Sequence, residues 1–325
     1  MTNRNPIVHA SLAGLRNPKH CASYLAGLIE GDGHINARQL IILFNGAHGQ
    51  GAQSLRSLLG GTVAPGKVSY SWRYVLTHRA SLDRVLRLTS CAWVGPYKAQ
   101  QIRTHGHDKR LNLNLTTDAP VTAGFWFAGF SDADGCFDIS IRRCRTSRSG
   151  LRVELRLTFS QRHPTLLVKI RDAFGVRNVH WDPGKPAGRV QITGQERLRT
   201  TVVPYFDAHP PLLKADQYDI WRRAFAIVLE RRHLTNDGLA KLKALRLQLT
   251  ALKKPPGSRC TGPLAVRTVA PATGCVPPSP AGRNGVRFSP GAREKPAVGP
   301  GADVRKLRRA VRHSVPVGLD RGRGG

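Results

Sequence analysis

The sequence predicts an α+β protein built from two copies of one α/β unit. Three observations lead to this prediction. A short motif occurs twice in the chain, together with matching segments downstream. Apolar residues recur with helical spacing inside the motif, and alternating apolar and polar residues follow it, as is typical of strands with one buried face.

The internal repeat rests on three pairs of segments in the same order. The motif YLAGLIEGDG at Tyr24–Gly33 is matched by WFAGFSDADG at Trp126–Gly135, an offset of 102 residues. The segment that starts at Leu43-Phe44 matches its counterpart in the second copy at an offset of 115 residues. The segment GPYKA, which begins at Gly95, matches PLLKA at an offset of 116 residues. The change in offset predicts an insertion of about thirteen residues in the second copy, in the turn-forming segment Arg143–Gly150.

Each copy follows the order helix, two strands, helix, two strands, helices. Leu25, Leu28 and Ile29 predict a helix over Ala22–Asp32, which Gly33 ends. The first copy continues with a helix through Leu55–Leu59 and with strands at Ile35–Arg38, Leu40–Phe44, Val63–Val68 and Ser71–Leu76. In the second copy the alternation is plainer, over Phe137–Arg142 and Arg152–Phe159, and it predicts half-buried strands with a polar, net basic face.

The charge of the chain indicates a polyanionic partner. Lys and Arg number 51 against 20 Asp and Glu, a formal charge of +31. Nucleic acid is the first candidate. A membrane surface is a weak second, and no membrane partner is expected, because no stretch approaches the ~18 apolar residues of a spanning helix. The six cysteines form no C-x-x-C pair, so we expect reduced thiols and neither a zinc site nor a disulfide framework.

The composition changes after Leu252. Residues 253–325 hold eleven of the 22 prolines and fifteen Lys and Arg against three acids. Few apolar residues there show any periodicity, so this basic tail is expected to be disordered. It is either a non-specific nucleic-acid arm or a dispensable extension, since nothing in it carries chemistry.

Leu25–Gly33 and Phe127–Gly135 resemble the LAGLIDADG signature, and the duplication resembles the single-chain homing endonucleases of that family. The resemblance covers about residues 20–250, with the first repeat at 1–112 and the second at 113–252. It implies two curved antiparallel sheets that form a saddle over double-stranded DNA, two signature helices packed at the centre, and a protein that acts as a monomer.

The residues of the motif suit that arrangement. Small residues recur in both signature helices and allow the two backbones to approach closely: Ala26, Gly27 and Gly31 in one, Ala128, Gly129 and Ala133 in the other. Close packing would bring Asp32 and Asp134 together at the two helix ends.

Two carboxylates at helix C-termini call for a cation. The helix dipole disfavours each by roughly 0.3–1 kcal/mol, and each disfavours the other. A divalent metal, with Mg²⁺ as the candidate, would relieve both penalties and serve phosphodiester hydrolysis. The expected metal-binding residues are Asp32, Asp134, Gly31 and Ala133. A single such motif could be an ordinary turn or part of a calcium loop, but two equivalent copies argue against this.

Three further residues are expected in catalysis. Lys98 and Lys214 occupy equivalent places in the repeat, and the resemblance implies that a basic residue there stabilises charge near the scissile phosphate. Gln161 matches a family glutamine that orients water. Gly46 stands at the equivalent position of the first repeat, so the two active sites are expected to be unequal. Glu30, where the signature has Asp, keeps the charge and is not the metal-binding position.

The polar strand faces are candidates for DNA contact, because Arg, Asn and Gln can pair with base edges in the major groove. The alternative for each is a solvated or phosphate-contacting side chain. The candidate DNA-binding residues are Asn36, Arg38, Arg73, Arg142, Arg152, Arg156, Arg189 and Gln191.

The sequence therefore predicts a site-specific, metal-dependent DNA endonuclease. Two alternatives are an intron maturase, which would hold intron RNA, and a transcription regulator on the same scaffold. The paired acids favour the nuclease, because a dedicated maturase needs no metal ligands, and no helix-turn-helix follows Thr250 to favour a regulator. The resemblance implies an intron-encoded protein of a mitochondrion or, alternatively, a chloroplast.

Overall fold

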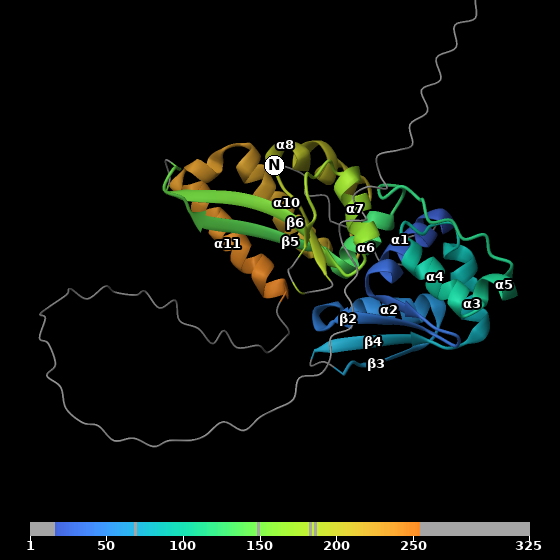
Figure 1. Ribbon diagram of the computed structural model, residues 1–325. Helices are drawn as coiled ribbons and strands as arrows, with labels where there is room; N and C mark the ends of the chain where they lie inside the picture. Colours follow the sequence, from blue (N-terminus) through green and yellow to red (C-terminus); the bar gives the residue numbers. More distant parts are fainter. Residues whose placement is uncertain (1–16, 68–69, 148–149, 182–183, 185–186, 254–325) are drawn as a thin grey trace, which may run out of the picture. The chain divides into compact units, whose positions relative to one another are not determined.

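Two antiparallel sheets of four strands, one in each repeat, organise the chain (Figure 1). The computed structural model describes residues 17–67, 70–147, 150–181, 184 and 187–253. The basic tail predicted for residues 253–325 lies outside these residues except for Lys253. No helix in the described part is long and apolar enough to cross a membrane.

The first repeat carries the sheet order β1-β2-β4-β3. It begins with α1 (Pro18–Asp32), β1 (Gly33–Ile35), β2 (Leu40–Asn45), the short 3-10 turn η2 (Gly46–His48) and α2 (Gly49–Leu59). It continues with β3 (Thr62–Pro65), β4 (Ser71–Leu76), α3 (Arg79–Thr89), α4 (Pro96–Thr104) and α5 (His107–Leu111).

The second repeat has the matching order β5-β6-β8-β7. Its elements are α6 (Trp126–Asp134), β5 (Cys136–Arg143), β6 (Leu151–Gln161), α7 (Pro164–Ala173), β7 (His180–Trp181) and β8 (Gly188–Ile192). Helical segments complete it: α8 (Gln195–Arg197), the π-helical turn η3 (Leu198–Val202), α9 (Val203–Ala208), α10 (Ala215–Leu229), η4 (Arg232–Leu234) and α11 (Asn236–Lys253).

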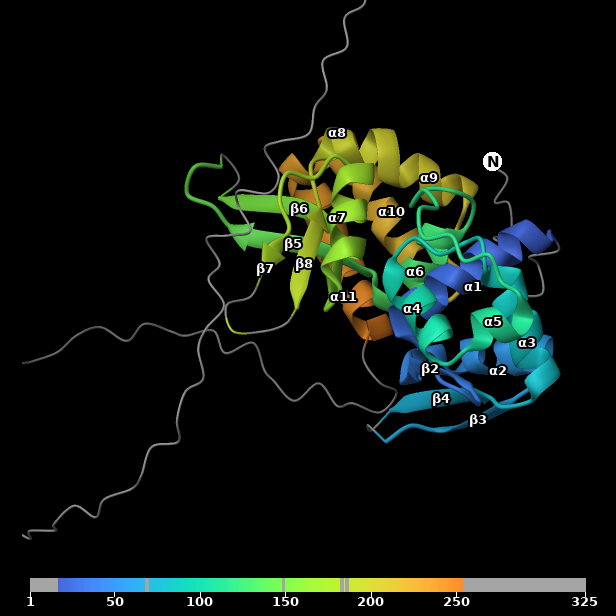
Figure 2. The ribbon, with the colours of Figure 1, turned by 45° about the vertical axis from the view of Figure 1, so that its right-hand side comes forward.

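The two signature helices α1 and α6 pack directly against each other (Figure 1 and Figure 2). A Cβ atom placed on Gly27 would lie 2.0 Å from the carbonyl oxygen of Trp126. One on Gly129 would lie 2.1 Å from the carbonyl oxygen of Tyr24. Both obstacles are backbone atoms, so only glycine fits at either position. This confirms the expected close approach of the two helices.

The core of each repeat lies between its sheet and its helices. The large apolar residues of the motifs are fully buried, namely Leu25, Leu28 and Ile29 in α1 and Phe127 and Phe130 in α6. Phe127 contacts the ring of Phe159 on β6 at a centroid distance of 5.2 Å. Burial of each such side chain stabilises the fold by about 1.5–3 kcal/mol.

The predicted strand at Ile35–Arg38 is wrong, because β1 ends at Ile35. The Asn36 side-chain oxygen accepts the backbone N–H groups of Arg38 and Gln39, each at 3.0 Å. These bonds form a side-chain-capped turn, which competes with the extended conformation. Asn36 and Arg38 therefore lie in the turn between β1 and β2. The helix before them ends as predicted at Gly33, with φ −86° and not in the left-handed region.

The hairpin of the second repeat is much longer than its counterpart. The strands β5 and β6 have 8 and 11 residues, whereas β1 and β2 have 3 and 6. The insertion expected near Arg143–Gly150 therefore lengthens both strands as well as the turn. The longer hairpin gives the second sheet a larger polar face.

Candidate active site

The C-terminal ends of α1 and α6 bring Asp32 and Asp134 into one site. Both side chains are half-buried. A Cβ atom on Gly31 would lie 2.3 Å from the Cβ of Ala133 and 3.2 Å from Oδ2 of Asp134. The absence of a side chain at Gly31 thus lets the two helix ends approach closely at Ala133, as the small residues of the motif predicted.

The pKa values of both carboxyl groups reflect their surroundings. Burial, followed by the charge of Asp134, raises the pKa of Asp32 to about 7. Burial raises the pKa of Asp134 to about 6, although a hydrogen bond from Gln161 opposes this rise. Lys98 and Lys214 lower both pKa values. The ionised form of both carboxyl groups is thus disfavoured mainly by burial, and the mutual repulsion expected from the sequence contributes for Asp32.

Lys98 and Lys214 are buried beside these helix ends, so neither is a solvated surface lysine. Lys98 is 4% exposed, and its Nζ donates a hydrogen bond to the carbonyl of Gly33. Burial lowers the pKa of Lys98 to about 8. Lys214 is 8% exposed, and burial lowers its pKa as well.

The ammonium of Lys214 caps the end of α6. Its Nζ donates to the carbonyl oxygens of Ser131 and Ala133, each at 2.9 Å, and to that of Gly135 at 2.8 Å. A cation at a helix C-terminus is electrostatically favourable. These bonds hold the Lys214 charge within reach of the carboxylate site.

Gln161 is the last residue of β6, and its side chain reaches the site. Its Nε2 donates a hydrogen bond to Oδ2 of Asp134. The structure therefore brings together all five residues that the sequence predicted for catalysis. Their catalytic roles remain predictions.

Sequence reasoning missed the function of the other acid in each motif. Asp132 is fully buried, and its Oδ2 accepts the backbone N–H groups of Leu212 at 2.7 Å and Leu213 at 3.0 Å. The same atom accepts the hydroxyl of Tyr24 at 2.8 Å, and Oδ1 accepts the N–H of Lys214 at 2.9 Å. Asp132 thus anchors the backbone that carries Lys214.

Glu30 does the same in the first repeat. Its carboxylate accepts the N–H groups of Val94 at 3.0 Å and Gly95 at 2.7 Å, just before Lys98. The indole N–H of Trp126 donates to it at 2.6 Å. The sequence signal for both acids was their equal placement in the two repeats, each paired with a downstream lysine segment.

The donor set fits a hard divalent cation. Among the residues that the structure describes, no three His, Cys, Asp or Glu side chains come together as metal ligands. Two carboxylates with backbone oxygens and water are the kind of site that Mg²⁺ accepts. The Ala133 carbonyl already accepts the Lys214 ammonium, although a carbonyl has a second lone pair. The roles of Gly31 and Ala133 as metal-binding residues remain predictions.

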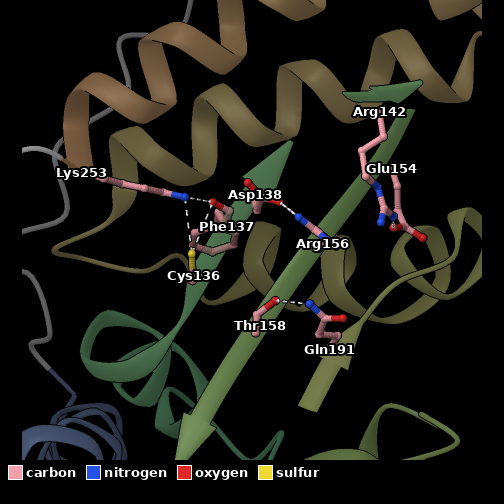
Figure 3. A network of polar contacts seen from close by, with 9 residues as sticks. All are labelled: Cys136, Phe137, Asp138, Arg142, Glu154, Arg156, Thr158, Gln191 and Lys253. Atoms are coloured by element: carbon pink, nitrogen blue, oxygen red, sulfur yellow. Dashed lines mark hydrogen bonds and ion pairs between the residues drawn. The ribbon is translucent and has the colours of Figure 1, made fainter. Parts of the chain in front are cut away.

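The open face of the second sheet carries paired charges (Figure 3). Arg156 forms an ion pair with Asp138 on the neighbouring strand. Arg142 and Arg152 share Glu154, at 3.0 and 3.6 Å.

Two further candidates for DNA contact lie on β8 of the same sheet. The amide of Gln191 lies 3.5 Å from the Thr158 hydroxyl. Arg189 is exposed, and no acidic group of the described residues lies within ion-pair distance of it. Together with the arginines of β5 and β6, these residues confirm the polar face predicted for the second copy.

The open face of the first sheet carries fewer charged side chains. Arg73 on β4 is half-buried and pairs in register with Leu43 and Ala64. Leu43 is 52% exposed, and the half-buried Ile41 and Val75 lie on the same face. The two sheets therefore offer different chemistry, and sequence analysis did not predict this difference.

Comparisons with known proteins agree with this architecture. A family model described as LAGLIDADG endonuclease matches residues 127–224. An uncharacterized cox1 intron-2 protein of 37.2 kDa from Schizosaccharomyces pombe is 30% identical over 240 residues, 70% of this chain and 72% of that protein. Probable intron-encoded endonuclease 3 of Neurospora crassa is 29% identical over 124 residues, 37% of this chain and only 23% of that protein.

Solved structures share the fold. The crystal structure of the I-LtrWI LAGLIDADG homing endonuclease bound to target DNA matches with a TM-score of 0.57 and 15% identity. The match covers 71% of this chain and 98% of that one. It confirms the predicted α+β fold of two repeats with antiparallel sheets. By the duplicated motif, its geometry and these relatives, the chain belongs to the LAGLIDADG endonuclease family.

Proposed function

We propose that this protein is a site-specific endonuclease that makes a double-strand break in a long DNA target by metal-dependent hydrolysis. The observation that carries the proposal is the paired carboxylate site at the ends of α1 and α6, with two buried lysines beside it. Clusters of ionisable groups with perturbed pKa values are frequent at catalytic centres.

The residues have separate roles in the proposed reaction. Asp32 and Asp134 would hold Mg²⁺ or a similar cation, which when bound supplies Lewis-acid activation and stabilises the leaving oxygen. Gln161 would orient the attacking water next to Asp134. The water oxygen bonds to phosphorus while the bond from phosphorus to the leaving oxygen breaks. The water gives a proton to solvent, and the leaving oxygen takes one up.

The lysines would stabilise the negative charge that develops on the phosphate. Lys98 and Lys214 are fixed by hydrogen bonds to carbonyl groups, so their charges need no reorganisation during the reaction. Burial makes the interaction of each ammonium with a phosphate stronger than it would be in water.

DNA binding would use the open faces of the two sheets. The formal charge of +31 favours a polyanion, and arginines now paired with Asp138 or Glu154 could exchange those partners for phosphates or bases. Because one chain contains both repeats, a monomer would suffice for a two-part target. The cox1 intron relative supports an intron-encoded protein of a mitochondrion.

The test is cleavage of a supercoiled plasmid that carries the joined exons flanking the gene. The wild-type protein should linearise this plasmid with Mg²⁺ and not with EDTA. The double variant Asp32→Asn/Asp134→Asn should bind the same DNA within a few-fold but not cut it. A matched control, Asp172→Asn/Asp219→Asn, changes two partly exposed acids elsewhere and should cut normally.

Cutting by the double variant at the wild-type rate would place the active site elsewhere. Tight binding of intron RNA by a wild-type protein that cuts no DNA would instead support a maturase.

A further inference from the structure

Two histidines lie at equivalent places beside the active site. His48 and His163 are offset by 115 residues, like Gly46 and Gln161, and each is the N-cap residue of the helix after its strand. Burial lowers the pKa of both histidines, and the charge of a lysine from the other repeat lowers it further, Lys214 for His48 and Lys98 for His163.

The two histidines have different neighbours. The ring of His163 stacks on Tyr97 with a centroid distance of 3.7 Å. Leu213 occupies the place equivalent to Tyr97 and packs against α2, where a Cβ atom on Gly51 would lie 2.5 Å from its Cδ2. Among the described residues, no aromatic ring stacks on His48.

His48 lines a cavity that contains the first carboxylate. The cavity has a volume of about 250 Å³, and Asp32, Asn45, Lys214 and Lys253 also line it. It provides space for water molecules beside Asp32. His48 therefore brings an imidazole to the cavity in which a nucleophile of the first site would be held.

A glutamine cannot replace Gly46 in this site. A Cβ atom on Gly46 would lie 2.5 Å from the carbonyl oxygen of Tyr70. The obstacle is backbone, so a side chain here would require the segment at Tyr70 to move. The first site therefore needs a different residue to do what Gln161 is proposed to do in the second.

The ring of His48 is suited to this task. Burial lowers its pKa to about 4, so the ring is neutral near pH 7. A hydrogen bond with the Leu213 backbone raises this pKa, which means that a ring N–H donates to the Leu213 carbonyl. A neutral imidazole has one donor and one acceptor nitrogen. With the donor engaged, the other nitrogen is left to accept a hydrogen bond.

We propose that His48 orients the attacking water of the first active site by accepting its hydrogen bond, in place of the glutamine that the second site uses. This inference rests on the proposed endonuclease function. It makes the two sites chemically different but both complete. It therefore replaces the expectation, drawn from Gly46 alone, that the first site lacks a water-orienting group.

The test is single-turnover cleavage of the joined-exon DNA, with each strand end-labelled in turn. The variant Gln161→Gly should slow one strand, which identifies the strand cut by the second site. His48→Ala should slow the opposite strand by about 10–100-fold, the effect of one positioned polar group. His48→Gln, which restores an acceptor, should recover most of that rate. His48→Leu keeps the bulk without an acceptor and should not recover it.

Two measurements separate catalysis from structure. DNA affinity in Ca²⁺ should be the same for wild type, His48→Ala and His48→Gln. Long-range ¹H–¹⁵N spectra of the free protein at pH 7 should show one protonated and one bare nitrogen on the His48 ring. The control His78→Ala changes an exposed histidine at the start of α3 and should cut both strands normally.

The outcomes are distinguishable. A wild-type protein that cuts neither strand would refute the endonuclease function itself. Normal cutting by wild type, with both strands unaffected in His48→Ala and His48→Leu, would overturn the role of His48 alone. A doubly protonated His48 ring at pH 7 would overturn it as well.

Discussion

Replacing Asp132 by Asn tests whether the first acid of the motif holds the catalytic lysine in place. The carboxylate is fully buried and accepts four hydrogen bonds. Asn is nearly the same size, so the change alters hydrogen bonding and charge and leaves no cavity. Three of the four bonds converge on Oδ2, and only the N–H of Lys214 donates to Oδ1.

The favoured orientation of the introduced amide follows from this geometry. Its oxygen would replace Oδ2 and keep the donors from Tyr24, Leu212 and Leu213. Its NH₂ group would then face the N–H of Lys214, two donors about 2.9 Å apart. One hydrogen bond to a charged acceptor is lost, at about 1.5–3 kcal/mol, and an N–H is left buried without a partner. Removal of the buried negative charge offsets part of these two costs, so we expect the free energy of unfolding to fall by about 3 kcal/mol.

The assay is urea and thermal unfolding of the full chain. A loss of about 3 kcal/mol lowers the melting temperature by roughly 6–12 °C in a protein of this size. Strand-specific cleavage by Asp132→Asn should also fall more than about tenfold, because the backbone of Lys214 shifts. The control Asp172→Asn changes a side chain that is 60% exposed and should stay within about 0.5 kcal/mol of wild type.

An Asp132→Asn variant that unfolds within about 1 kcal/mol of wild type would refute the reasoning. So would wild-type cleavage by a variant that is measurably destabilised, since Lys214 would then be held by other means.

Three further predictions follow from the packing, the open faces and the tail. Gly129→Ala should lower the free energy of unfolding by about 3 kcal/mol, because its Cβ would meet the Tyr24 carbonyl at 2.1 Å; an unchanged urea midpoint would contradict this. Leu43 and its apolar neighbours should contact thymine methyl groups. Deoxyuridine in place of thymidine should therefore weaken binding about fourfold per contact in one half-site only, as measured by fluorescence anisotropy; equal losses in both half-sites would argue against it. Removing residues 254–325 should lower the dependence of DNA affinity on salt and leave the cleavage pattern unchanged; a truncated protein that is folded but inert would reveal another role for the tail.

The fold was predictable where burial alternates strictly along the chain. The strand Ser71–Leu76 has the predicted bounds, because every second side chain packs on the core. The turn that replaces the predicted strand Ile35–Arg38 could not be predicted in this way, since it is capped by a hydrogen bond from the Arg38 backbone N–H to the Asn36 side chain. Such a local hydrogen bond leaves the pattern of apolar residues unchanged, so the pattern does not reveal it.

The site was predictable where the repeat placed like residues at like positions. Asp32 and Asp134 were found in this way, as were both lysines. The roles of Glu30 and Asp132 were not, because most of their partners are backbone N–H groups that no residue letter specifies. Nor could the sequence reveal that His48 faces a cavity, which depends on how Leu213 packs across the repeat interface.

The links between the repeats bear on how the two cuts would be coordinated. Tyr24 of the first repeat completes the hydrogen bonding of Asp132, and Trp126 of the second completes that of Glu30. Each acid anchors the lysine segment of its own repeat, so a disturbance of either signature helix reaches both lysines.

The open faces of the two sheets, by contrast, do not share such links, and their side chains differ. Since the first face exposes apolar side chains such as Leu43 and the second is lined with paired arginines, the two halves of the DNA target should differ in sequence, and a palindrome would leave one sheet poorly matched.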